Sequence, residues 1–283
     1  MTSTRTPLVS PDELAAGIAA GNAPVILDAS FDLADPDAGA RQFAAGHIPG
    51  SQHVHLDRDL AGAKTGRNGR HPLPERRDFA RTAGRLGIGP DTPVVALDAQ
   101  GSVYAARVWW MLRWLGHEAV AVLDGGLQGW KQAGMAMSTE PGRVVAAPPY
   151  PERPSLAPMA DIEAVAGRSS STALLDARAP ERFRGETEPL DRVAGHMPGA
   201  LNRFYKANLG TGGRFKSADE LRHEFAALLG ERRAAGVIHS CGSGVTACHN
   251  LLAMEHAGLA GSVLYPGSWS EWSSDPARPV ATG

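Results

Sequence analysis

The sequence is poor in cysteine and nearly balanced in charge. Its 283 residues include only Cys241 and Cys248, and no CxxC or HxxxH spacing is present. Two cysteines cannot form a disulfide framework, and these spacings give no structural zinc site. The formal net charge is only −2, which favours neither a nucleic-acid partner nor an anionic membrane surface. We therefore predict no metal and no nucleic-acid partner.

Long hydrophobic runs are also missing. No apolar stretch approaches the roughly 18 residues of a membrane-spanning helix, and residues 1–14 lack the apolar core of a signal peptide. These absences predict a cytoplasmic protein without a membrane partner. The rest of the composition, 43% apolar and 20% charged residues, is typical of globular proteins, and the length suggests two domains.

An internal repeat runs through the chain. Three short motifs recur in the same order in both halves: LDA at 27–29 and 175–177, GHxPG at 46–50 and 195–199, and a glycine pattern with tryptophan at 124–130 and 266–272. Extending the last alignment backwards without a gap places Ala99 opposite Cys241. We therefore expect two halves of one fold, of which only the second has a cysteine at this position.

Prolines mark the boundary between the halves. Six of them fall within 141–158, at positions 141, 148, 149, 151, 154 and 158. This density excludes a helix or a central strand and indicates a semi-extended linker. We predict a first domain at 1–140, a proline-rich linker at 141–158 and a second domain at 159–283.

Short apolar runs alternate with helical patterns in each half. The runs at 24–28, 93–98 and 120–124 are matched by runs at 173–176, 236–240 and 262–265. Near-continuous apolar strands are typical of a parallel sheet covered on both faces. Capping boxes at Ser10 and Ser217 predict helix starts, and 103–115 predicts another helix. Each half is therefore expected to be an α/β domain with a mainly parallel sheet and helices on both faces.

The segment 239–247, HSCGSGVTA, carries the clearest chemical signal. A strand ends, Cys241 follows, and a glycine-rich turn leads into a helix. Backbone N–H groups in such a turn and the helix N-terminus favour an anion, so Cys241 is expected to be a thiolate nucleophile. A phosphatase loop would need an arginine six residues after the cysteine, where this chain has Ala247. Cys248 is in register with apolar helix residues and is expected to be core.

Taken together, these motifs resemble the tandem-rhodanese sulfurtransferases. The matching segments are GHIPGS at 46–51, LDGGLQGW at 123–130, DARAPERFRG at 176–185, GHMPGA at 195–200 and CGSGVTA at 241–247. The resemblance covers nearly the whole chain and implies an inactive first domain and a catalytic second one. It implies that Cys241 takes sulfur from a donor, holds it as a persulfide and passes it to an acceptor such as cyanide or a thiol of thioredoxin. No cofactor is implied.

The loop after the cysteine resembles that of the 3-mercaptopyruvate enzymes. Gly242, Ser243, Gly244, Val245 and Thr246 match their Gly-Ser-Gly-Val-Thr pattern and are expected to contact substrate. Thiosulfate enzymes carry two basic residues there instead. A neutral loop lacks the local cations that a doubly charged donor would favour.

The resemblance implies further site residues. Arg182 is expected to bind the substrate carboxylate, while the second arginine that often follows Glu-Pro is replaced by Leu190, with Arg192 two residues on. A serine–histidine–aspartate relay would comprise Ser243, His71 and Asp57 and would polarise the substrate carbonyl or move a proton. The motif histidines His47 and His196 are instead expected to make structural hydrogen bonds.

The sequence is also compatible with two other functions. Thiosulfate could be the preferred donor in the same chemistry. Alternatively, the protein could be a non-catalytic module that holds a persulfide for a protein partner. Steady turnover with cyanide would exclude the carrier, and the two donors' kcat/KM values would separate the enzymes.

Overall fold

A computed structural model describes residues 6–283 of the chain. Residues 1–5, which belong to the expected first domain and to the N-terminal stretch considered above, lie outside the described residues. Contacts divide the chain into two compact units. Unit 1 comprises Met1–Leu60, Pro74–Leu156 and Gly210–Phe215, and unit 2 comprises Ala61–Leu73, Ala157–Leu209 and Lys216–Gly283.

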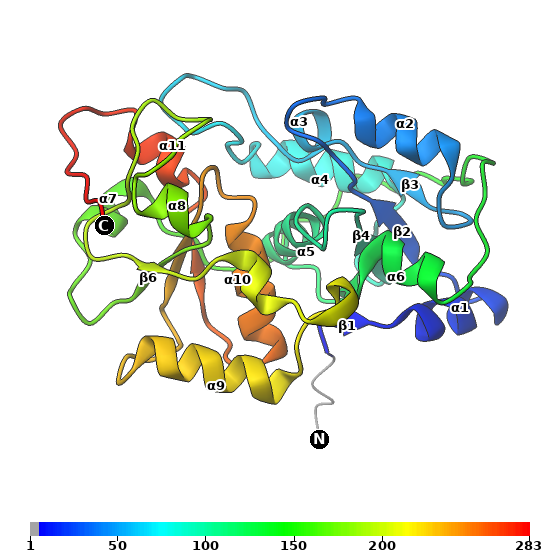
Figure 1. Cartoon of the computed structure of the whole chain (residues 1–283). Coiled ribbons are helices and arrows are strands. Elements are labelled where there is room, and N and C mark those ends of the chain that lie inside the picture. Colours follow the sequence, from blue (N-terminus) through cyan, green and yellow to red (C-terminus); the bar gives the residue numbers. More distant parts are fainter. Residues whose placement is uncertain (1–5) are drawn as a thin grey trace. The chain divides into compact units, whose positions relative to one another are not determined.

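Unit 1 is built on a five-stranded parallel sheet of order β1-β5-β4-β2-β3 (Figure 1). Its strands are β1 Leu8–Val9, β2 Val25–Asp28, β3 Gln52–His53, β4 Val94–Leu97 and β5 Val120–Leu123. Its α-helices are α1 Pro11–Ala19, α2 Ala38–Ala45, α3 Leu56–Asp59, α4 Arg76–Arg85, α5 Ala105–Trp114 and α6 Gly126–Gln132. The short helix η2, Thr211–Gly213, also belongs to this unit.

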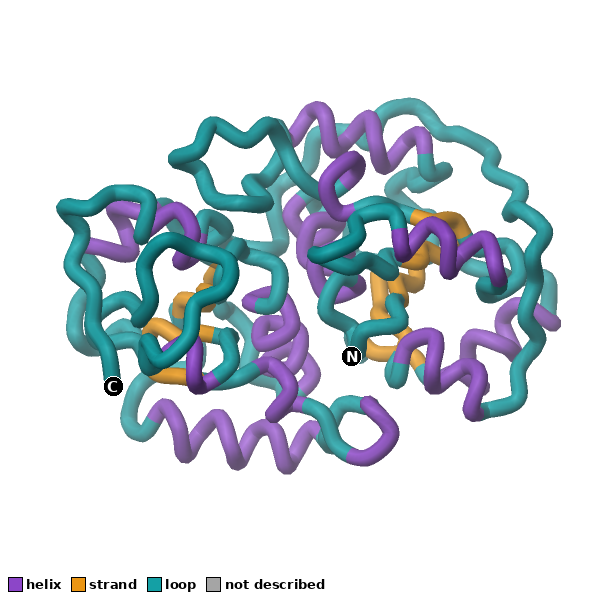
Figure 2. The backbone as a smooth tube through the Cα atoms, turned by 45° about the horizontal axis from the view of Figure 1, so that its top comes forward, coloured by secondary structure: helices purple, strands orange, loops and turns teal. Residues whose placement is uncertain are grey.

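Unit 2 contains a four-stranded parallel sheet of order β7-β6-β8-β9. Its strands are β6 Leu174–Asp176, β7 Leu201–Asn202, β8 Ile238–Ser240 and β9 Val263–Leu264. Its helices are α7 Ile162–Ala166, α8 Pro180–Phe183, η1 Tyr205–Asn208, α9 Ala218–Leu229, α10 Ala247–His256 and α11 Ser268–Trp272. Figure 2 shows the strands of each unit with helices around them.

The repeat in the sequence is a repeat in structure. The order β5-β4-β2-β3 in unit 1 matches β9-β8-β6-β7 in unit 2. Two left-handed backbone positions match in the alignment that pairs Ala99 with Cys241: Ser102 and Gly244 have φ of 67° and 72°, and Gly126 and Ser268 both have φ of 54°. Two others differ, because Gly101 and Gly125 are left-handed whereas the aligned Ser243 and Gly267 are not. The predicted α/β fold with a parallel sheet in each half is confirmed.

Local signals position the helices as expected. Ser10 and Ser217 each accept a bond from the backbone N–H three residues on, and Glu13 and Glu220 complete the two capping boxes. The motif histidines are structural as well. His47 and His196 are buried, and each bonds through Nδ1 to a nearby backbone carbonyl and stacks on a phenylalanine. These contacts fix the chain where the GHxPG motifs turn.

The proline-rich stretch forms no helix or strand, as its composition predicts. Most of it packs on unit 1. Ala147 N donates to Gly84 O at 2.8 Å, and Tyr150, which is buried, donates through its N–H to Ala80 O at 2.9 Å. Gly84 has no room for a side chain, because a Cβ there would lie 2.4 Å from Pro148 O. Residues 141–156 are therefore part of a compact unit as well as a connection.

No helix in residues 6–283 is both long and apolar enough to cross a lipid bilayer.

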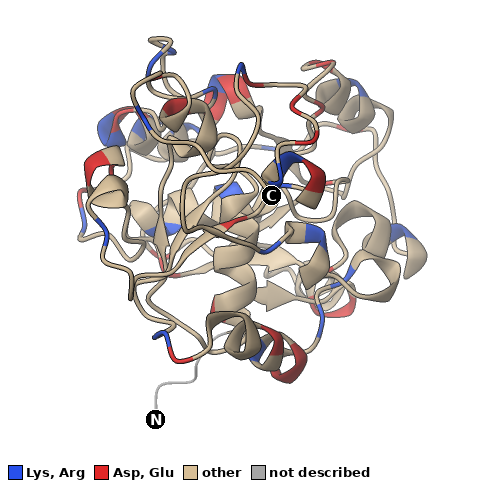
Figure 3. Ribbon diagram, turned by 60° about the vertical axis from the view of Figure 1, so that its left-hand side comes forward, with Lys and Arg blue, Asp and Glu red and all other residues tan. Residues whose placement is uncertain are grey.

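Charged side chains lie mainly on the helices and loops and are few in the strands. Figure 3 shows basic and acidic residues interspersed along the helices and loops, while most of the ribbon in the sheets is uncharged. The sheets are correspondingly apolar, with every residue of β4 buried.

One buried side chain in unit 2 is an exception. His239 lies in the middle of β8 and is fully buried, and neither ring nitrogen has a hydrogen-bond partner among the described residues. Burial disfavours the charged imidazolium and lowers the pKa of His239 to about 3. The folded protein therefore carries a neutral histidine that the unfolded chain would protonate below its ordinary pKa of about 6.5.

This histidine predicts a specific acid sensitivity. As the pH falls from about 6.5 towards 3, the unfolded state gains a proton that the folded state does not, so His239 alone lowers the free energy of unfolding by about 1.4 kcal/mol per pH unit. We expect His239→Val to flatten that dependence and to raise stability at pH 5. Urea unfolding at several pH values measures this, with the exposed His223→Val as control. An unchanged slope in His239→Val would contradict the prediction.

Candidate active site

Cys241 lies at the carboxyl end of β8, the central strand that precedes α10. Three hydrogen bonds fix the backbone there against α11: Cys241 N donates to Ser268 Oγ at 3.0 Å, Cys241 O accepts from Trp269 N at 3.0 Å, and Gly242 O accepts from Ser270 N at 2.9 Å. Gly244 is required in this turn, because a Cβ would lie 2.2 Å from Pro266 O. The cysteine is thus held rigidly, with only 1% of its surface exposed.

The matching turn in unit 1 shows what such a loop binds. The carboxylate of Asp98, which is buried, accepts four backbone N–H bonds of 2.7–2.9 Å, from Gln100, Ser102, Tyr104 and Ala105. Burial raises the pKa of Asp98, and the four N–H groups act against that rise. The turn is therefore a ring of N–H groups around an anion that unit 1 supplies itself.

The aligned residues in unit 2 differ at the decisive positions. Ser240 stands where unit 1 has Asp98, and its hydroxyl donates to Leu175 O at 3.4 Å. Cys241 stands where unit 1 has Ala99. The predicted loop residues Gly242, Ser243, Gly244, Val245 and Thr246 follow in the turn and are all buried except Thr246. Because residue 240 is a serine, this position supplies no carboxylate to the backbone N–H groups of the loop.

Two predicted site residues are in direct contact. His71 Nδ1 lies 2.8 Å from Ser243 Oγ, and both side chains are buried. Although His71 precedes the proline-rich stretch in sequence, residues 61–73 belong to unit 2. Asp57 lies in α3 of unit 1, where its backbone N–H donates to His55 Nδ1 at 3.2 Å. Its place in a relay stays a prediction.

Arg70 also lies at the loop, and no sequence motif pointed to it. A Cβ on Gly242 would lie 2.7 Å from Arg70 Nη2 and 3.6 Å from both terminal nitrogens of Arg182, so two guanidinium groups lie over the loop. Arg70 N donates to Ser270 Oγ at 3.0 Å, which fixes this segment on α11. The loop itself is neutral, as expected, but its surroundings supply two cations. The expected position for a second arginine holds Leu190, which is exposed, as is Arg192.

Acidic side chains hold these arginines in place. Arg182 Nη2 donates to Glu188 Oε1 at 2.6 Å, and Arg70 forms an ion pair with Asp191. Burial by itself would raise the pKa of Glu188, but its bonds to Arg182 and to two backbone N–H groups outweigh burial and hold that pKa below its usual value. No sequence pattern indicates the ion pair between Arg70 and Asp191, because these residues are 121 positions apart and meet only in the folded chain.

A second, deeper ion pair supports this arrangement. Arg178 is buried and binds the carboxylate of Asp176 through Nε and Nη2, at 3.0 and 2.7 Å to Oδ2. Its guanidinium also lies 4.8 Å from the centre of the Trp269 ring and bonds to Gly195 O. Burial would lower the pKa of Arg178, but its carboxylate neighbours Asp176 and Glu188 raise it above its usual value. Arg178 is therefore held as a permanent cation beneath Glu188.

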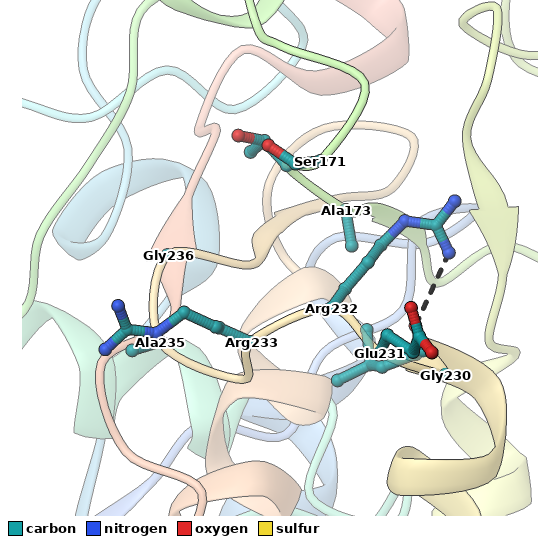
Figure 4. A pocket seen from close by; sticks show the side chains of 10 residues that line it. Ser171, Ala173, Gly230, Glu231, Arg232, Arg233, Ala235 and Gly236 are labelled. Carbon is teal, nitrogen blue, oxygen red and sulfur yellow. Dashed lines mark hydrogen bonds between the residues drawn. The ribbon is translucent and has the colours of Figure 1, made fainter.

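A cavity of about 650 Å³ lies elsewhere in unit 2. It is lined by residues 171–173, which precede β6, and by 229–233, 235 and 236, which precede β8. Figure 4 shows Arg232 and Arg233 in its wall. Since Cys241 follows β8, this cavity is at the opposite end of the strand from the cysteine. None of the predicted site residues lines it.

Comparison with known proteins identifies the family. The model of the rhodanese-like domain matches residues 10–133 and 161–275. The chain belongs to the rhodanese family. It is a tandem-rhodanese protein, with one domain in each repeat. The sequence prediction of this family is confirmed.

Several tandem-rhodanese relatives cover nearly the whole chain. A Pseudomonas aeruginosa protein named "Probable 3-mercaptopyruvate sulfurtransferase" is 46% identical over 266 residues, 92% of each chain. Thiosulfate sulfurtransferase of Gallus gallus is 32% identical over 274 residues, 94% of this chain and 92% of that protein. The structure of 3-mercaptopyruvate sulfurtransferase from Leishmania major superposes with a TM-score of 0.82 at 31% identity, covering 94% of this chain and 74% of that one. The predicted enzyme class, sulfurtransferase, is confirmed.

Asp98 provides a test of the anion-binding turn in unit 1. Replacing it by Asn removes the charge and points an amide N–H group at backbone N–H donors. We expect Asp98→Asn to lower the free energy of unfolding by about 2–4 kcal/mol, because a buried, charge-assisted network is broken. Chemical denaturation measures this. The exposed Asp12→Asn is the control, and equal stability of the two variants would show that the turn needs no anion.

Proposed function

We propose that this tandem-rhodanese protein transfers sulfur from 3-mercaptopyruvate to a thiol or cyanide acceptor through a persulfide on Cys241. The proposal rests on the side chains that surround the loop at 241–246. Cys241, the Ser243–His71 pair and two guanidinium groups, those of Arg70 and Arg182, all belong to unit 2 and converge on it. A nucleophile, a polarising hydroxyl and carboxylate-binding groups are what this donor requires.

The first half-reaction needs only the donor and the thiolate. Cys241 Sγ attacks the donor sulfur, a sulfur–sulfur bond forms, and the carbon–sulfur bond breaks with its electron pair left on carbon. The leaving group is the enolate of pyruvate, which becomes pyruvate on taking up one proton. The sulfur is oxidised as the carbon is reduced, so no external oxidant or reductant is needed.

The second half-reaction restores the enzyme. An acceptor thiolate or cyanide attacks the outer sulfur of the persulfide and releases the Cys241 thiolate. The products are an acceptor persulfide or thiocyanate. A thiol of thioredoxin is the protein acceptor we propose, and a cytoplasmic setting, where such thiols are kept reduced, fits this chemistry.

Arg182 and Arg70 would bind the donor carboxylate. Guanidinium groups bind carboxylates through two parallel hydrogen bonds, and both lie over Gly242, next to the nucleophile. Arg70 thus supplies the second cation that Leu190 does not. A carboxylate held there places the adjoining carbonyl and the sulfur of this short donor close to Ser243 and Cys241.

Ser243 would polarise the donor carbonyl and return the proton. Its hydroxyl is bonded to His71, which can accept or supply that proton as the enolate forms and collapses. The relay that the resemblance implies also includes Asp57, which lies in unit 1, and its part in the reaction stays a prediction. Thiosulfate has no carbonyl, so this pair favours mercaptopyruvate as donor.

The loop backbone would hold the persulfide. In unit 1 the aligned turn brings four N–H groups around the carboxylate of Asp98. The aligned N–H groups in unit 2 belong to Gly242, Gly244, Thr246 and Ala247. These N–H groups are suited to a persulfide anion on Cys241, and Val245 in the same turn is buried.

Thiosulfate as the preferred donor is the second candidate. Arg70 and Arg182 favour it, because they place two cations beside a loop that has none of its own. The carboxylates paired with them offset this attraction. A non-catalytic persulfide carrier is the third reading, and multiple turnovers with cyanide exclude it. Steady-state kinetics with each donor decide between the first two.

The persulfide can be observed directly. Incubation with mercaptopyruvate should add one sulfur atom, about 32 Da, to the intact protein. The adduct should be absent in Cys241→Ser and present in Cys248→Ser, which matches it in residue type but lies in α10. Intact-mass spectrometry measures this. An adduct that survives in Cys241→Ser but disappears in Cys248→Ser would overturn the assignment.

Arg182 should control donor binding more than chemistry. We expect Arg182→Ala to raise KM for mercaptopyruvate by about 10- to 150-fold, the loss of one charge-assisted hydrogen bond. Arg182→Lys should recover only part, because lysine lacks the planar fork. Arg184→Ala is a matched control, since Arg184 is exposed and pairs with Glu186. An unchanged KM in Arg182→Ala would limit that residue to its ion pair with Glu188.

A further inference from the structure

The guanidinium groups at the loop are already paired with carboxylates of the protein. Asp191 contacts both: it forms an ion pair with Arg70, and its Oδ2 lies 3.5 Å from Arg182 Nη2. Glu188 binds Arg182 through two contacts, Oε1–Nη2 at 2.6 Å and Oε2–Nε at 3.3 Å. A donor carboxylate must therefore share these arginines with two resident acids.

The resident acids are much less exposed than ordinary surface acids. The side chains of Glu188 and Asp191 are only 4% and 6% exposed, against 17% for Arg182 and 27% for Arg70. With Arg178 and Asp176, which lie beneath them, the cluster has three guanidinium groups and three carboxylates. Its formal charges cancel. Since the cluster is poorly solvated, its charge balance acts on any nearby anion with little screening.

We propose that Asp191 sets the charge of the donor that this site accepts, by cancelling the surplus positive charge of Arg70 and Arg182. The inference rests on the proposed function, in which the two arginines bind the donor. A cluster with no net charge can hydrogen-bond a monoanion such as mercaptopyruvate, but it gives a second negative charge on the donor no additional attraction. A cluster with one net positive charge would attract a dianion such as thiosulfate more strongly than a monoanion.

Asp191 is a cleaner place to test this than Glu188. Glu188 also accepts the N–H groups of Leu190 and Asp191 and contacts Arg178, so its removal disturbs the backbone of the loop. The carboxylate of Asp191 contacts the two arginines at issue. Asp191→Asn keeps the size of the side chain and one oxygen acceptor, and removes only the charge.

The first experiment compares donors. We expect Asp191→Asn to raise the ratio of kcat/KM for thiosulfate to that for mercaptopyruvate by about tenfold, the effect of one unit charge at several ångströms in a partly solvated site. The control is Asp219→Asn, which makes the same change in net charge in α9, on a side chain 90% exposed. Equal ratios in the two variants would overturn the proposal.

The second experiment needs no turnover and uses two tetrahedral anions of similar size. Methanesulfonate carries one negative charge and sulfate two. In the wild-type protein, sulfate should protect Cys241 from iodoacetamide no more than about twofold better than methanesulfonate, and Asp191→Asn should raise that preference about tenfold. Peptide mass spectrometry reads the modification at Cys241. A strong preference of the wild-type protein for sulfate contradicts the proposal, even if the variant does not fold.

The two experiments separate this inference from the proposed function. If neither donor is turned over but the anion preference changes as expected, the charge assignment stands and the proposed reaction fails. If mercaptopyruvate is turned over well but Asp191→Asn behaves like Asp219→Asn in both experiments, the reaction stands and the charge assignment fails. Glu188→Gln also leaves the cluster with one net positive charge, and a preference for monoanions in that variant would contradict the proposal as well.

Discussion

The turn after the central strand of each sheet is the constraint on which the rest of the structure depends. In unit 1 four backbone N–H groups of this turn converge on the carboxylate of Asp98, which satisfies them within the unit. Unit 2 has serine and cysteine at the aligned positions. The aligned turns therefore differ in what they hold: unit 1 supplies its own carboxylate, whereas unit 2 has a cysteine at the start of the turn.

The charges around the second turn come from other parts of the chain. Arg70 arrives on a loop from before the proline-rich stretch, while Arg182, Glu188 and Asp191 follow β6. Beneath them, Arg178 ties the GHxPG motif, the end of β6 and the Trp269 ring together. Because this framework is held by mutual pairing, a loop with no charged side chain of its own still lies in a strongly structured electrostatic environment.

Much of the fold could be predicted because its signals are local or repeated. Apolar runs located the central strands, capping boxes located α1 and α9, and the repeat gave the correspondence of Ala99 with Cys241. The edge strands β1, β3 and β7 are two residues long and lie in no apolar run that marked them, whereas β9, which is equally short, falls within the run at 262–265. Arg70 was overlooked because no pattern in its own segment distinguishes it. Its importance follows from contacts with Asp191 and Gly242, which only the folded chain brings together.

The assignment of residues 61–73 to unit 2 has a consequence for how this protein can be divided. The repeat suggests two modules that recombination or truncation could separate at the proline-rich stretch. A fragment of residues 159–283 would retain Cys241 and Ser243 but would lose both Arg70 and His71. A division at the proline-rich stretch would therefore separate Arg70 and His71 from Asp191 and Ser243, which they contact in unit 2.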